Sequence, residues 1–427
     1  MSDAVVIRNA RHWSDGRIVD LAFSGGVVLP RPPAQARSIE AEGAVLAPGL
    51  VDVHVHLREP GQSNKETLAT GMRAAAAGGF TDVLCMPNTR PVVDSPAWVE
   101  WVAAHAREAG HCRVHPIAAV TVGQAGATLC EMVGLAQAGA IAFSDDGRPI
   151  ASAATMRVAL EYARSTGRPI IAHEEDLGLK GDGHMNEGPA AVRLGHRGIP
   201  TAAESVMVRR DIELAELTGG RLHLAHLSCA SSLEALRDAK RRGLAVTGET
   251  CPHYWTLTDE AVSEWGTAAK MNPPLRSDAD RRAVITAIAD GTIDCLATDH
   301  APHTAEDKRQ PFESAPFGIV GLETAIALTI THLVEPGHIG LTRAIELWSD
   351  APRRAFGLPR VTLEPGTPAD LTLIDPAAEW VVDPGRFFTK GRNTPFAGAP
   401  LRGRVRLTVC EGRVTHESAG VSVEAHA

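Results

Sequence analysis

The alternation of strand-like and helix-like segments between residues 51 and 357 is the feature that most restricts how this chain can fold. Eight short apolar segments alternate there with amphipathic helical patterns. Apolar strands separated by helices are typical of parallel strands that are covered by helices. The strand candidates are 51–56, 81–86, 113–118, 140–144, 169–173, 221–226, 244–249 and 293–298. The helical patterns include 64–77, 96–108, 152–165, 202–217, 231–242 and 278–289.

Eight strand–helix units in about 300 residues predict a (β/α)8 barrel of the TIM type. We expect this barrel to occupy residues 51–357 and to be the catalytic domain. A doubly wound open sheet is the alternative fold. The strand count and the absence of a Gly-x-Gly-x-x-Gly turn weigh against it.

Both ends of the chain hold short strand-like pieces with almost no helical periodicity. Those pieces are 4–8, 19–23 and 44–46 near the N-terminus, and 370–374, 380–382, 404–410 and 413–415 near the C-terminus. Each end is too short to bury a core alone. We therefore expect residues 1–50 and 358–427 to pair into one small β-sandwich domain.

Charge and cysteine usage limit the compartment and the partners. The formal net charge is −9 without a basic stripe or tail, which argues against a nucleic-acid partner. The seven Cys are scattered without a Cys-x-x-Cys, a pattern typical of buried thiols in a reducing cytoplasm. Neither a signal peptide nor an apolar run of the roughly 20 residues that span a bilayer is present. We expect a cytoplasmic protein with no membrane partner.

The segment 51–60 reads VDVHVHLREP and carries the first chemical signal. His54 and His56 lie two apart in a strand, so both imidazoles point to the same side. Two such imidazoles form a chelate for a borderline metal such as zinc. Arg58 follows the strand, where a guanidinium can bind an anionic substrate. A single His-x-His in a strand is more often incidental than metal-binding. Polar residues on the other predicted strands are therefore needed to support a metal site here.

Polar residues mark the C-terminal ends of the other predicted strands as well. They are Asn88, Asp145, Asp146, His173, His226 and Asp299. In these barrels the active site lies at that face, because the βα loops converge there. Four His and two Asp in one mouth predict a metal centre suited to zinc. Six ligands exceed the needs of one tetrahedral zinc, which favours two metals that share a bridging oxygen.

A series of motifs follows the same order along nearly the whole chain. They are PGLVDVHVHLREPG at 48–61 with KE at 65–66, MPNT at 86–89, FSDDG at 143–147, AHEE at 172–175, HLAHLS at 223–228, ETCPH at 249–253, KMNPPLR at 270–276, TDHAPH at 298–303 and PFG at 316–318. In this ordered set the chain resembles the amidohydrolase superfamily and, within it, the class I dihydroorotases. A lone Asp-x-His-x-His would indicate only the superfamily.

The resemblance implies a role for each metal ligand. His54, His56 and Asp299 would hold the more buried metal, and His173 and His226 the other. Asp146 would bridge both metals, where related hydrolases use a carboxylated lysine. No lysine stands at that strand end, which separates this chain from hydantoinase-like relatives. The choice of Asp146 over Asp145 rests on alignment with the family motif.

The resemblance also implies the substrate contacts. Arg58, Asn88 and His303 match positions that bind the substrate carboxylate. Asn272 and the backbone of Phe317 and Gly318 match positions that contact the edge of the pyrimidine ring.

The implied reaction is that of a dihydroorotase with two zinc ions per subunit. A hydroxide that bridges the metals would attack the ring carbonyl, and a metal would stabilise the oxyanion. Asp299 would shuttle the proton to the departing ring nitrogen. In reverse, the site would cyclise N-carbamoyl-L-aspartate to (S)-dihydroorotate in de novo pyrimidine biosynthesis.

Two other functions stay open at this point. Another cyclic amidohydrolase, acting on hydantoins or allantoin, would use the same chemistry, but a hydantoin without a carboxylate leaves Arg58 without a partner. A catalytically silent homologue that scaffolds aspartate transcarbamoylase is the other candidate, although every ligand position is filled. We expect a small-molecule substrate and a homodimer, with aspartate transcarbamoylase as a candidate partner of an active enzyme too.

The remaining polar residues receive structural interpretations. We expect His253 to be structural, His300 to support the ligands from behind, and Asp52 to face away from His54. The histidines taken as surface or packing residues are His184, His196, His223 and His332. The charged segment 304–315 is either a mobile lid or an ordinary solvated loop.

Overall fold

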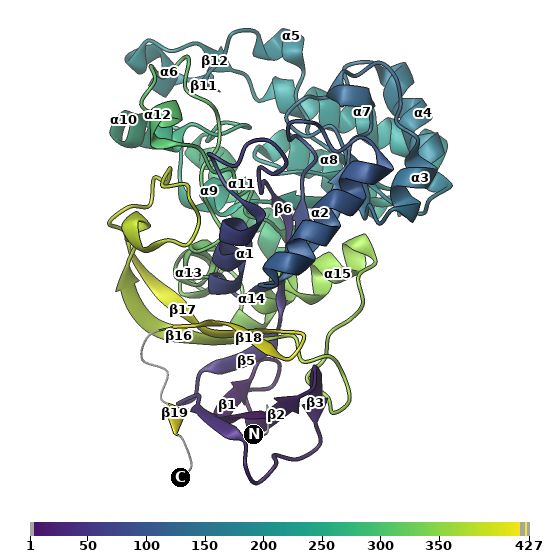
Figure 1. Ribbon diagram of the computed structural model, residues 1–427. Helices are drawn as coiled ribbons and strands as arrows, with labels where there is room; N and C mark the ends of the chain where they lie inside the picture. The colour runs from purple at the N-terminus through teal and green to yellow at the C-terminus, as the bar shows by residue number, and fades with distance from the viewer. Residues whose placement is uncertain (1–3, 419–422, 425–427) are drawn as a thin grey trace.

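Eight parallel strands form the expected barrel in the computed structural model, which describes residues 4–418 and 423–424 (Figure 1). In order around the sheet they are β6 (Leu50–Val55), β7 (Phe80–Cys85), β8 (Arg113–Ala118), β9 (Ala142–Ser144), β10 (Ile170–Ala172), β13 (Leu222–Leu224), β14 (Val246–Thr250) and β15 (Cys295–Leu296). The barrel closes where Val55 of β6 bridges His300, in the segment after β15, and the His56 N–H donates to the His300 carbonyl at 2.9 Å. The predicted fold class is confirmed.

Asp52 fastens this closure of the barrel. Its carboxylate accepts hydrogen bonds from the Thr298 amide at 3.1 Å and from the Thr298 hydroxyl at 2.5 Å. Asp52 therefore ties the first strand to the segment that follows the eighth. This seam sets the relative position of His54, in β6, and Asp299, just after β15.

Helices surround the barrel at the positions that the periodicity predicts. Those helices are α1 (Leu68–Ala77), α2 (Pro96–Ala109), α4 (Ala153–Arg164), α7 (Ala202–Thr218), α8 (Ala230–Arg241) and α11 (Asp278–Ala289), with α14 (Leu341–Trp348) and α15 (Asp350–Phe356) after the last strand. Helix α1 begins four residues later than expected because Thr67 and Thr70 form a capping box there. No helix in the described part of the chain is long and apolar enough to cross a membrane.

Several short elements were not predicted. Four of them lie between β10 and α7: α5 (Leu177–Lys180), β11 (Met185–Asn186), α6 (Pro189–Leu194) and β12 (Gly198–Ile199). The others are the short helices α3 (Met132–Gln137), α9 (Pro252–Thr256), α10 (Ala261–Trp265), α12 (Ala305–Lys308) and α13 (Ala325–Thr329). Most span fewer than two helical turns, which is too little for a hydrophobic period to be visible in the sequence.

Strands from both ends of the chain build a single β-rich part beside the barrel (Figure 1). They are β1 (Val5–His12), β2 (Ile18–Ser24), β3 (Val27–Leu29), β4 (Arg37–Glu40), β5 (Val45–Pro48), β16 (Leu371–Val381), β17 (Pro400–Cys410), β18 (Arg413–Glu417) and β19 (Val423–Glu424). β1 branches, because its first half pairs with β4 and its end with β5. The enclosed side chains, such as Phe23 and Leu373, form a core of their own. The exact domain boundaries stay a prediction.

An ion network joins the barrel to the β-rich part. Asp82 of β7 accepts hydrogen bonds from Arg113 at 2.8 and 2.9 Å and from Arg353 at 2.7 Å, and Arg113 also donates to Asp370 at 2.7 Å. Burial alone would raise the pKa of Asp82, but His115, Arg113 and Arg353 hold it well below its ordinary value. The charged form of Asp82 is thus the one that the fold selects.

We expect an Asp82→Asn variant to lose about 3–5 kcal/mol of unfolding free energy at pH 7, because the buried guanidinium of Arg353 and the partly buried one of Arg113 lose a charged partner. The native pKa is depressed, so the stabilisation is present above the unfolded value of about 4 and is lost as the pH falls below it. Urea titrations at pH 7 and at about pH 3, well below that unfolded value, measure both effects. Asp15→Asn, in the exposed pair with Arg17, is the matched control and should change little. A constant difference at both pH values would contradict this account.

Candidate active site

The six predicted metal ligands come together at the C-terminal mouth of the barrel. Each lies in or just after a strand of the barrel and is buried: His54, His56, Asp146, His173, His226 and Asp299. Segments more than 200 residues apart in the sequence therefore supply side chains to one place, as in the pair His56 and Asp299, whose Nε2 and Oδ1 atoms lie 3.1 Å apart.

One group of ligand atoms centres on the first and last strands. His54 Nε2 lies 3.5 Å from Asp299 Oδ1, and His56 Nε2 lies 3.1 Å from the same oxygen. The ligand atoms of these three residues all lie within 4.8 Å of one another. Two nitrogens and a carboxylate oxygen at this spacing suit a divalent cation.

A second group centres on Asp146. Its Oδ1 lies 3.5 Å from His173 Nδ1 and 3.6 Å from His226 Nε2. The same carboxylate reaches the first group, with Oδ1 at 3.5 Å from His54 Nε2 and Oδ2 at 3.5 Å from His56 Nε2. Asp146 is thus the side chain that touches all four imidazoles.

The hydrogen bonds around His54, in β6, and His56, just after it, leave the Nε2 atoms available as ligands. His54 Nδ1–H donates to Glu249 Oε1 at 2.7 Å, and His56 Nδ1–H donates to Asn88 Oδ1 at 2.8 Å. Both Nε2 lone pairs therefore face the carboxylates. Among the described residues His54 Nε2 and Asp146 Oδ1 are buried without a hydrogen-bond partner. Orphaned buried atoms of this kind fit a bound cation.

The His54 imidazole and the Asp146 carboxylate shift each other's pKa values in the direction that favours the charged forms. Burial alone would lower the pKa of His54, but the Glu249 and Asp146 carboxylates raise it well above its ordinary value. Burial would raise the pKa of Asp146, but His54 and its other imidazole neighbours hold it well below the usual range. Protons and cations therefore compete for the same nitrogens, and metal binding should weaken as the pH falls.

The predicted substrate residues line one cleft with the candidate ligands. This cleft has a volume of about 210 Å³, and its lining includes Arg58, Asn88, Asn272, His303, Phe317 and Gly318, together with five of the six ligands. Burial lowers the pKa of Arg58 only to about 10, so its guanidinium is charged at neutral pH. The cleft thus presents a cation within the same small space as the metal ligands.

The protonation of His303 follows from its neighbours. Its Nε2 lies 2.8 Å from the Phe317 carbonyl and its Nδ1 lies 3.3 Å from Lys65 Nζ. Burial and the charges of Arg58 and Lys65 lower the pKa of His303, so the ring is neutral. Nε2–H then donates to Phe317, and Nδ1 accepts from Lys65.

Comparison with known proteins agrees with this site. The sequence pattern of the family described as Dihydro-orotase-like matches residues 43–232. A dihydroorotase of Anaeromyxobacter sp. (strain K) is 54% identical over 405 residues, covering 94% of this chain and 92% of that protein. One from Desulforapulum autotrophicum is 50% identical over 400 residues, covering 94% and 93%. The chain belongs to the dihydroorotase family.

Solved structures place this dihydroorotase-family enzyme among related cyclic-amide hydrolases. The L-hydantoinase (dihydropyrimidinase) of Arthrobacter aurescens superposes with a TM-score of 0.87 at 26% identity, covering 99% of this chain and 98% of that one. A dihydropyrimidinase from Brevibacillus agri gives a TM-score of 0.81 at 22% identity. The barrel with its β-rich part is therefore shared within this wider group.

Glu249 is a residue of the dihydroorotase-family site that the sequence interpretation missed. It lies in β14, and its carboxylate joins His54 Nδ1 to His223 Nε2 at 2.7 and 3.1 Å. His223, expected to be a surface or packing residue, is fully buried and packs edge-on against Phe356, and it also binds this carboxylate, which the sequence interpretation did not predict. An acidic residue at the end of the seventh strand was the available signal.

We expect a Glu249→Gln variant to bind metal about 10–100-fold more weakly, because the buried carboxylate that orients His54 loses its charge. Competition with a chelator measures the affinity. Glu161→Gln changes an exposed carboxylate paired with Arg157 and is the control. Equal metal affinities in the two variants would show that Glu249 does not contribute to metal binding.

Asp145, the alternative to Asp146, points elsewhere. Its Oδ1 accepts from the Val120 and Thr121 amides at 2.9 and 3.1 Å, and its Oδ2 accepts from the Thr121 hydroxyl. Its carboxylate is therefore engaged in holding the loop after β8.

Three of the predicted site residues have left-handed backbone conformations. The φ angles are 63° at Arg58, 36° at His226 and 49° at Asp299. Non-glycine residues adopt this region at a cost, and such residues gather at functional sites. The bends at these points turn the side chains into the mouth.

The other histidine expectations have mixed outcomes. His300 lies behind the centre as expected, with Nε2 at 3.5 Å from Glu66 and Nδ1 accepting from the Gly321 amide. His253 is fully buried, and its Nε2 is unpartnered among the described residues. His196 stacks on Phe312 near the surface.

The buried Lys270 and the half-buried Lys308, which belongs to the segment itself, hold the segment 304–315 in place. Lys270 Nζ donates to the carbonyls of Phe312, Glu313 and Ala315, two of them at 3.2 and 2.7 Å. Lys308 Nζ donates to the carbonyls of Thr267 and Pro316 at 2.9 and 2.8 Å. The segment is therefore tied to the barrel wall beside the cleft at several points.

Proposed function

We propose that this dihydroorotase-family enzyme interconverts N-carbamoyl-L-aspartate and (S)-dihydroorotate in pyrimidine biosynthesis, with two zinc ions per subunit. The observation that carries the proposal is the buried, charged Arg58 in the same cleft as the candidate metal ligands. Both compounds carry a carboxylate that such a guanidinium binds with charge-assisted hydrogen bonds. Hydantoins and dihydropyrimidines without a carboxylate would leave this cation unpaired.

The side chains of the mouth fit a two-metal centre. His54, His56 and Asp299 would hold one cation, His173 and His226 the other, and Asp146 would contact both. When bound, such cations lower the pKa of a water molecule and polarise a carbonyl oxygen. Nitrogen and carboxylate donors without a thiolate are a ligand set that suits zinc.

The protein's own residues orient the ring. Arg58 and His303 lie together, with Arg58 Nη2 at 3.4 Å from His303 Nε2, and form the side of the cleft that would face the carboxylate. Asn272 also lines the cleft, next to a candidate metal ligand, with its amide nitrogen at 3.3 Å from His173 Nε2. A substrate held between them places its ring amide toward the metal ligands, which converts binding energy into orientation.

Asp299 would carry the proton. Its Oδ1 faces both His54 and His56, and these imidazoles hold the pKa of the carboxylate below its ordinary value although burial alone would raise it. Asp299 is therefore ionised at neutral pH and can accept a proton from the attacking water. It would then deliver that proton to the ring nitrogen as the amide bond breaks.

A pair of matched substrates tests this function. Dihydrouracil is dihydroorotate without the carboxylate. We expect the zinc-loaded enzyme to open dihydroorotate and to close N-carbamoyl-L-aspartate, with dihydrouracil and hydantoin turned over far more slowly. Preference for dihydrouracil would favour the hydantoinase-like alternative, and inactivity toward all four compounds would favour a silent homologue.

We further propose that the enzyme is a cytoplasmic homodimer with aspartate transcarbamoylase as a candidate partner. Free thiols at all seven cysteines, each buried, support a reducing compartment. Size-exclusion chromatography of the enzyme alone and with the transcarbamoylase tests the assembly.

A further inference from the structure

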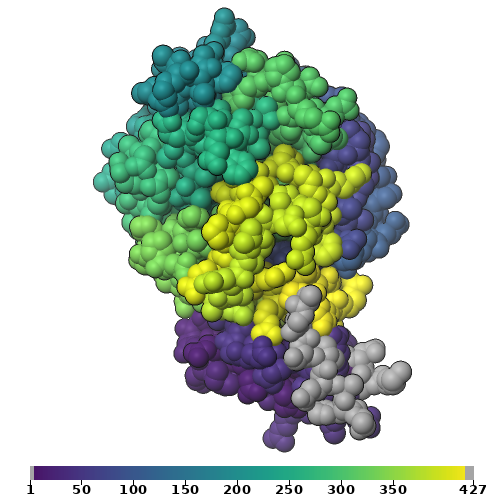
Figure 2. All heavy atoms as spheres, turned by 90° about the vertical axis from the view of Figure 1, so that its left-hand side faces the viewer, coloured from purple at the N-terminus to yellow at the C-terminus, as the bar shows by residue number. Residues whose placement is uncertain are grey.

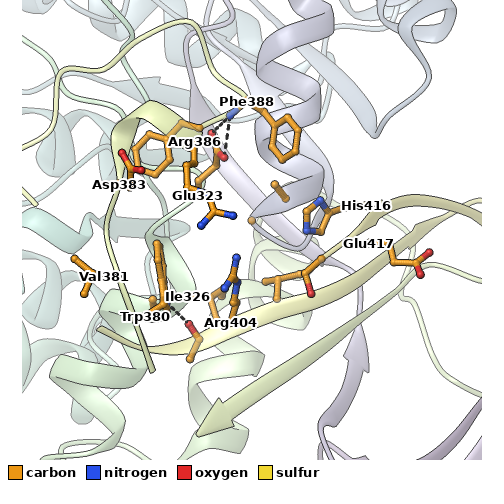
Figure 3. Close-up of a pocket in the computed structure, with 17 residues that line it drawn as sticks. Glu323, Ile326, Trp380, Val381, Asp383, Arg386, Phe388, Arg404, His416 and Glu417 are labelled. Atoms are coloured by element: carbon orange, nitrogen blue, oxygen red, sulfur yellow. Dashed lines mark hydrogen bonds between the residues drawn. The ribbon is translucent and has the colours of Figure 1, made fainter. Parts of the chain in front are cut away.

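A second cavity lies away from the metal centre, between the barrel and the β-rich part. Its volume is about 520 Å³. Its walls come from the end of α1, from α13, from the loop 383–388, and from β16, β17 and β18 (Figure 3). It opens on the face shown in Figure 2, where a hollow lies among the atoms of the C-terminal strands. Pockets of this size between two structural layers are typical of small-molecule sites.

Two arginines dominate the charge of this cavity. Arg386 extends into it from the loop and Arg404 from β17, so that the two side chains approach from opposite walls (Figure 3). Neither guanidinium has a carboxylate partner in residues 4–418 and 423–424; Arg404 lies over the Trp380 ring at 5.9 Å. Both side chains are exposed, so water screens their repulsion, and an anion that enters the cavity could bind both of them.

The carboxylates of the cavity are engaged elsewhere. Asp383 accepts from the Gly385 amide at 2.9 Å, and Glu417 pairs with Arg37 at 2.6 Å. Glu323 accepts from the Phe388 amide at 2.9 Å, and burial raises its pKa to about 7, so it is only partly charged at neutral pH. A hydrogen bond from an amide leaves the charge of Asp383 in place, so the two arginines face Asp383 and the partly charged Glu323, and a positive charge remains.

Aromatic side chains form the apolar part of the cavity. Trp380 is fixed by a hydrogen bond from its Nε1–H to the Gly403 carbonyl at 3.0 Å. Phe388 and His416 meet edge to face with their centroids 5.9 Å apart. Burial and the charge of Arg404 lower the pKa of His416 to about 4, so this ring is a neutral hydrogen-bonding group. The Arg73 guanidinium already lies over the Phe388 ring at 4.8 Å, so a planar ligand would meet the remaining side of that ring and the Trp380 ring.

We propose that this cavity is an effector site for a small oxyanion carried on a planar ring, with the anionic group between Arg386 and Arg404 and the ring against Trp380 and Phe388. A phosphate and a carboxylate share the chemistry that these two guanidinium groups bind.

One segment connects this site to the substrate cleft. In residues 387–393, named here the connecting segment, the amides of Phe388 and Thr389 donate to Glu323 at the cavity. The Thr389 hydroxyl and the Lys390 amide then bind Glu66, which lies 3.5 Å from His300. The segment thus passes from the cavity wall to the support of the metal centre within a few residues.

Asn393 ends the connecting segment at the substrate cleft. Its Oδ1 accepts from the His303 amide at 3.1 Å, and its Nδ2 donates to the carbonyls of Ala301 and Gly318 at 3.0 Å each. Asn393 is therefore a positioning residue that fastens two walls of the cleft to each other. A ligand that shifts Phe388 acts on the same hydrogen-bonded segment and should change substrate affinity.

Calorimetry with the metal-loaded full chain tests the site without reference to activity. Phenyl phosphate, benzoate, inorganic phosphate and phenol separate the contributions of the ring, the phosphate and the carboxylate. We expect phenyl phosphate or benzoate to bind with a Kd below about 1 mM, and phenol to bind far more weakly. The variants Arg386→Gln and Arg404→Gln should each weaken binding about tenfold or more.

Two control variants locate the binding. Arg402→Gln changes an exposed arginine of the same strand that pairs with Glu335 and should leave the Kd unchanged. Arg58→Met removes the cation of the substrate cleft and should also leave it unchanged. Binding that survives both cavity substitutions, or that disappears in Arg58→Met, would overturn the proposal, as would no binding up to about 10 mM.

The coupling is a separate measurement and rests on the proposed function. A saturating concentration of the tightest probe should change the KM for dihydroorotate by about fivefold or more, and an Asn393→Ser variant should remove that change. An unchanged KM in the wild-type enzyme would refute the effector role. If dihydroorotate is not a substrate, the calorimetric result still decides whether the cavity binds the oxyanion.

Discussion

An Asp146→Ala variant is expected to lose at least one metal equivalent and roughly 10³-fold or more of its turnover, which is about 4 kcal/mol of transition-state stabilisation. The reason is geometric. The Asp146 carboxylate lies within 3.5–3.6 Å of a nitrogen of His54, His56, His173 and His226, so its removal takes an oxygen from both groups of ligands. Elemental analysis of the purified protein and steady-state rates on dihydroorotate measure the two effects.

Asp145→Asn is the matched control for this variant. The Asp145 oxygens accept from Val120 and Thr121 and do not face the imidazoles, so both metal equivalents should remain. Unchanged metal content and rate in Asp146→Ala would refute the bridging assignment. Loss of metal in Asp145→Asn alone would show that Asp145, and not Asp146, is the ligand shared by the two metals.

An Arg58→Met variant is expected to raise the KM for dihydroorotate about 100-fold, because the substrate carboxylate loses charge-assisted hydrogen bonds in a buried cleft. Arg58 is almost fully buried and its side chain anchors to the Pro302 carbonyl at 3.2 Å, so it is already oriented before substrate binds. Parallel measurements of kcat, KM and thermal stability separate a binding defect from a folding defect.

The slow turnover of dihydrouracil provides the internal control for Arg58. A substrate without the carboxylate has nothing to lose, so its kcat/KM should change little in Arg58→Met. Arg17→Met, in an exposed pair with Asp15, controls for the loss of a positive charge from the protein. A similar loss on both substrates would show that Arg58 shapes the cleft instead of reading the carboxylate.

The elements and residues that could be predicted from sequence are those whose signal is local. Apolar segments of strand length identify β6 and the other barrel strands, and the barrel rule then places the residues after them at one mouth. The predicted ends of short strands differ, as in β15, which spans only Cys295–Leu296. There the chain bends to bring Asp299 into the site, and regular pairing ends early.

The residues that could not be predicted act through contacts between distant segments. Glu249 meets His54 across 195 positions, and Asn393 meets His303 across 90. The place of Glu249 at the end of a strand is a local signal, but no period or local motif reports the partner of either residue. Lys270 is a further example, since a lysine in a polar motif is normally exposed, whereas here its ammonium is enclosed by backbone carbonyls. These roles depend on how the elements pack together.

The branched sheet also has a consequence for synthesis on the ribosome. Strand β5 needs β16 as its neighbour, with Ala47 opposite Thr372, so the earliest strands emerge with an open edge and wait for more than 300 residues of translation. Every candidate ligand has been made once Asp299 is added, whereas Asn393 arrives later. A nascent chain that stops short of β16 therefore carries the whole set of metal-binding side chains, but the wall of the cleft is unsecured and a hydrophobic strand is exposed to aggregation.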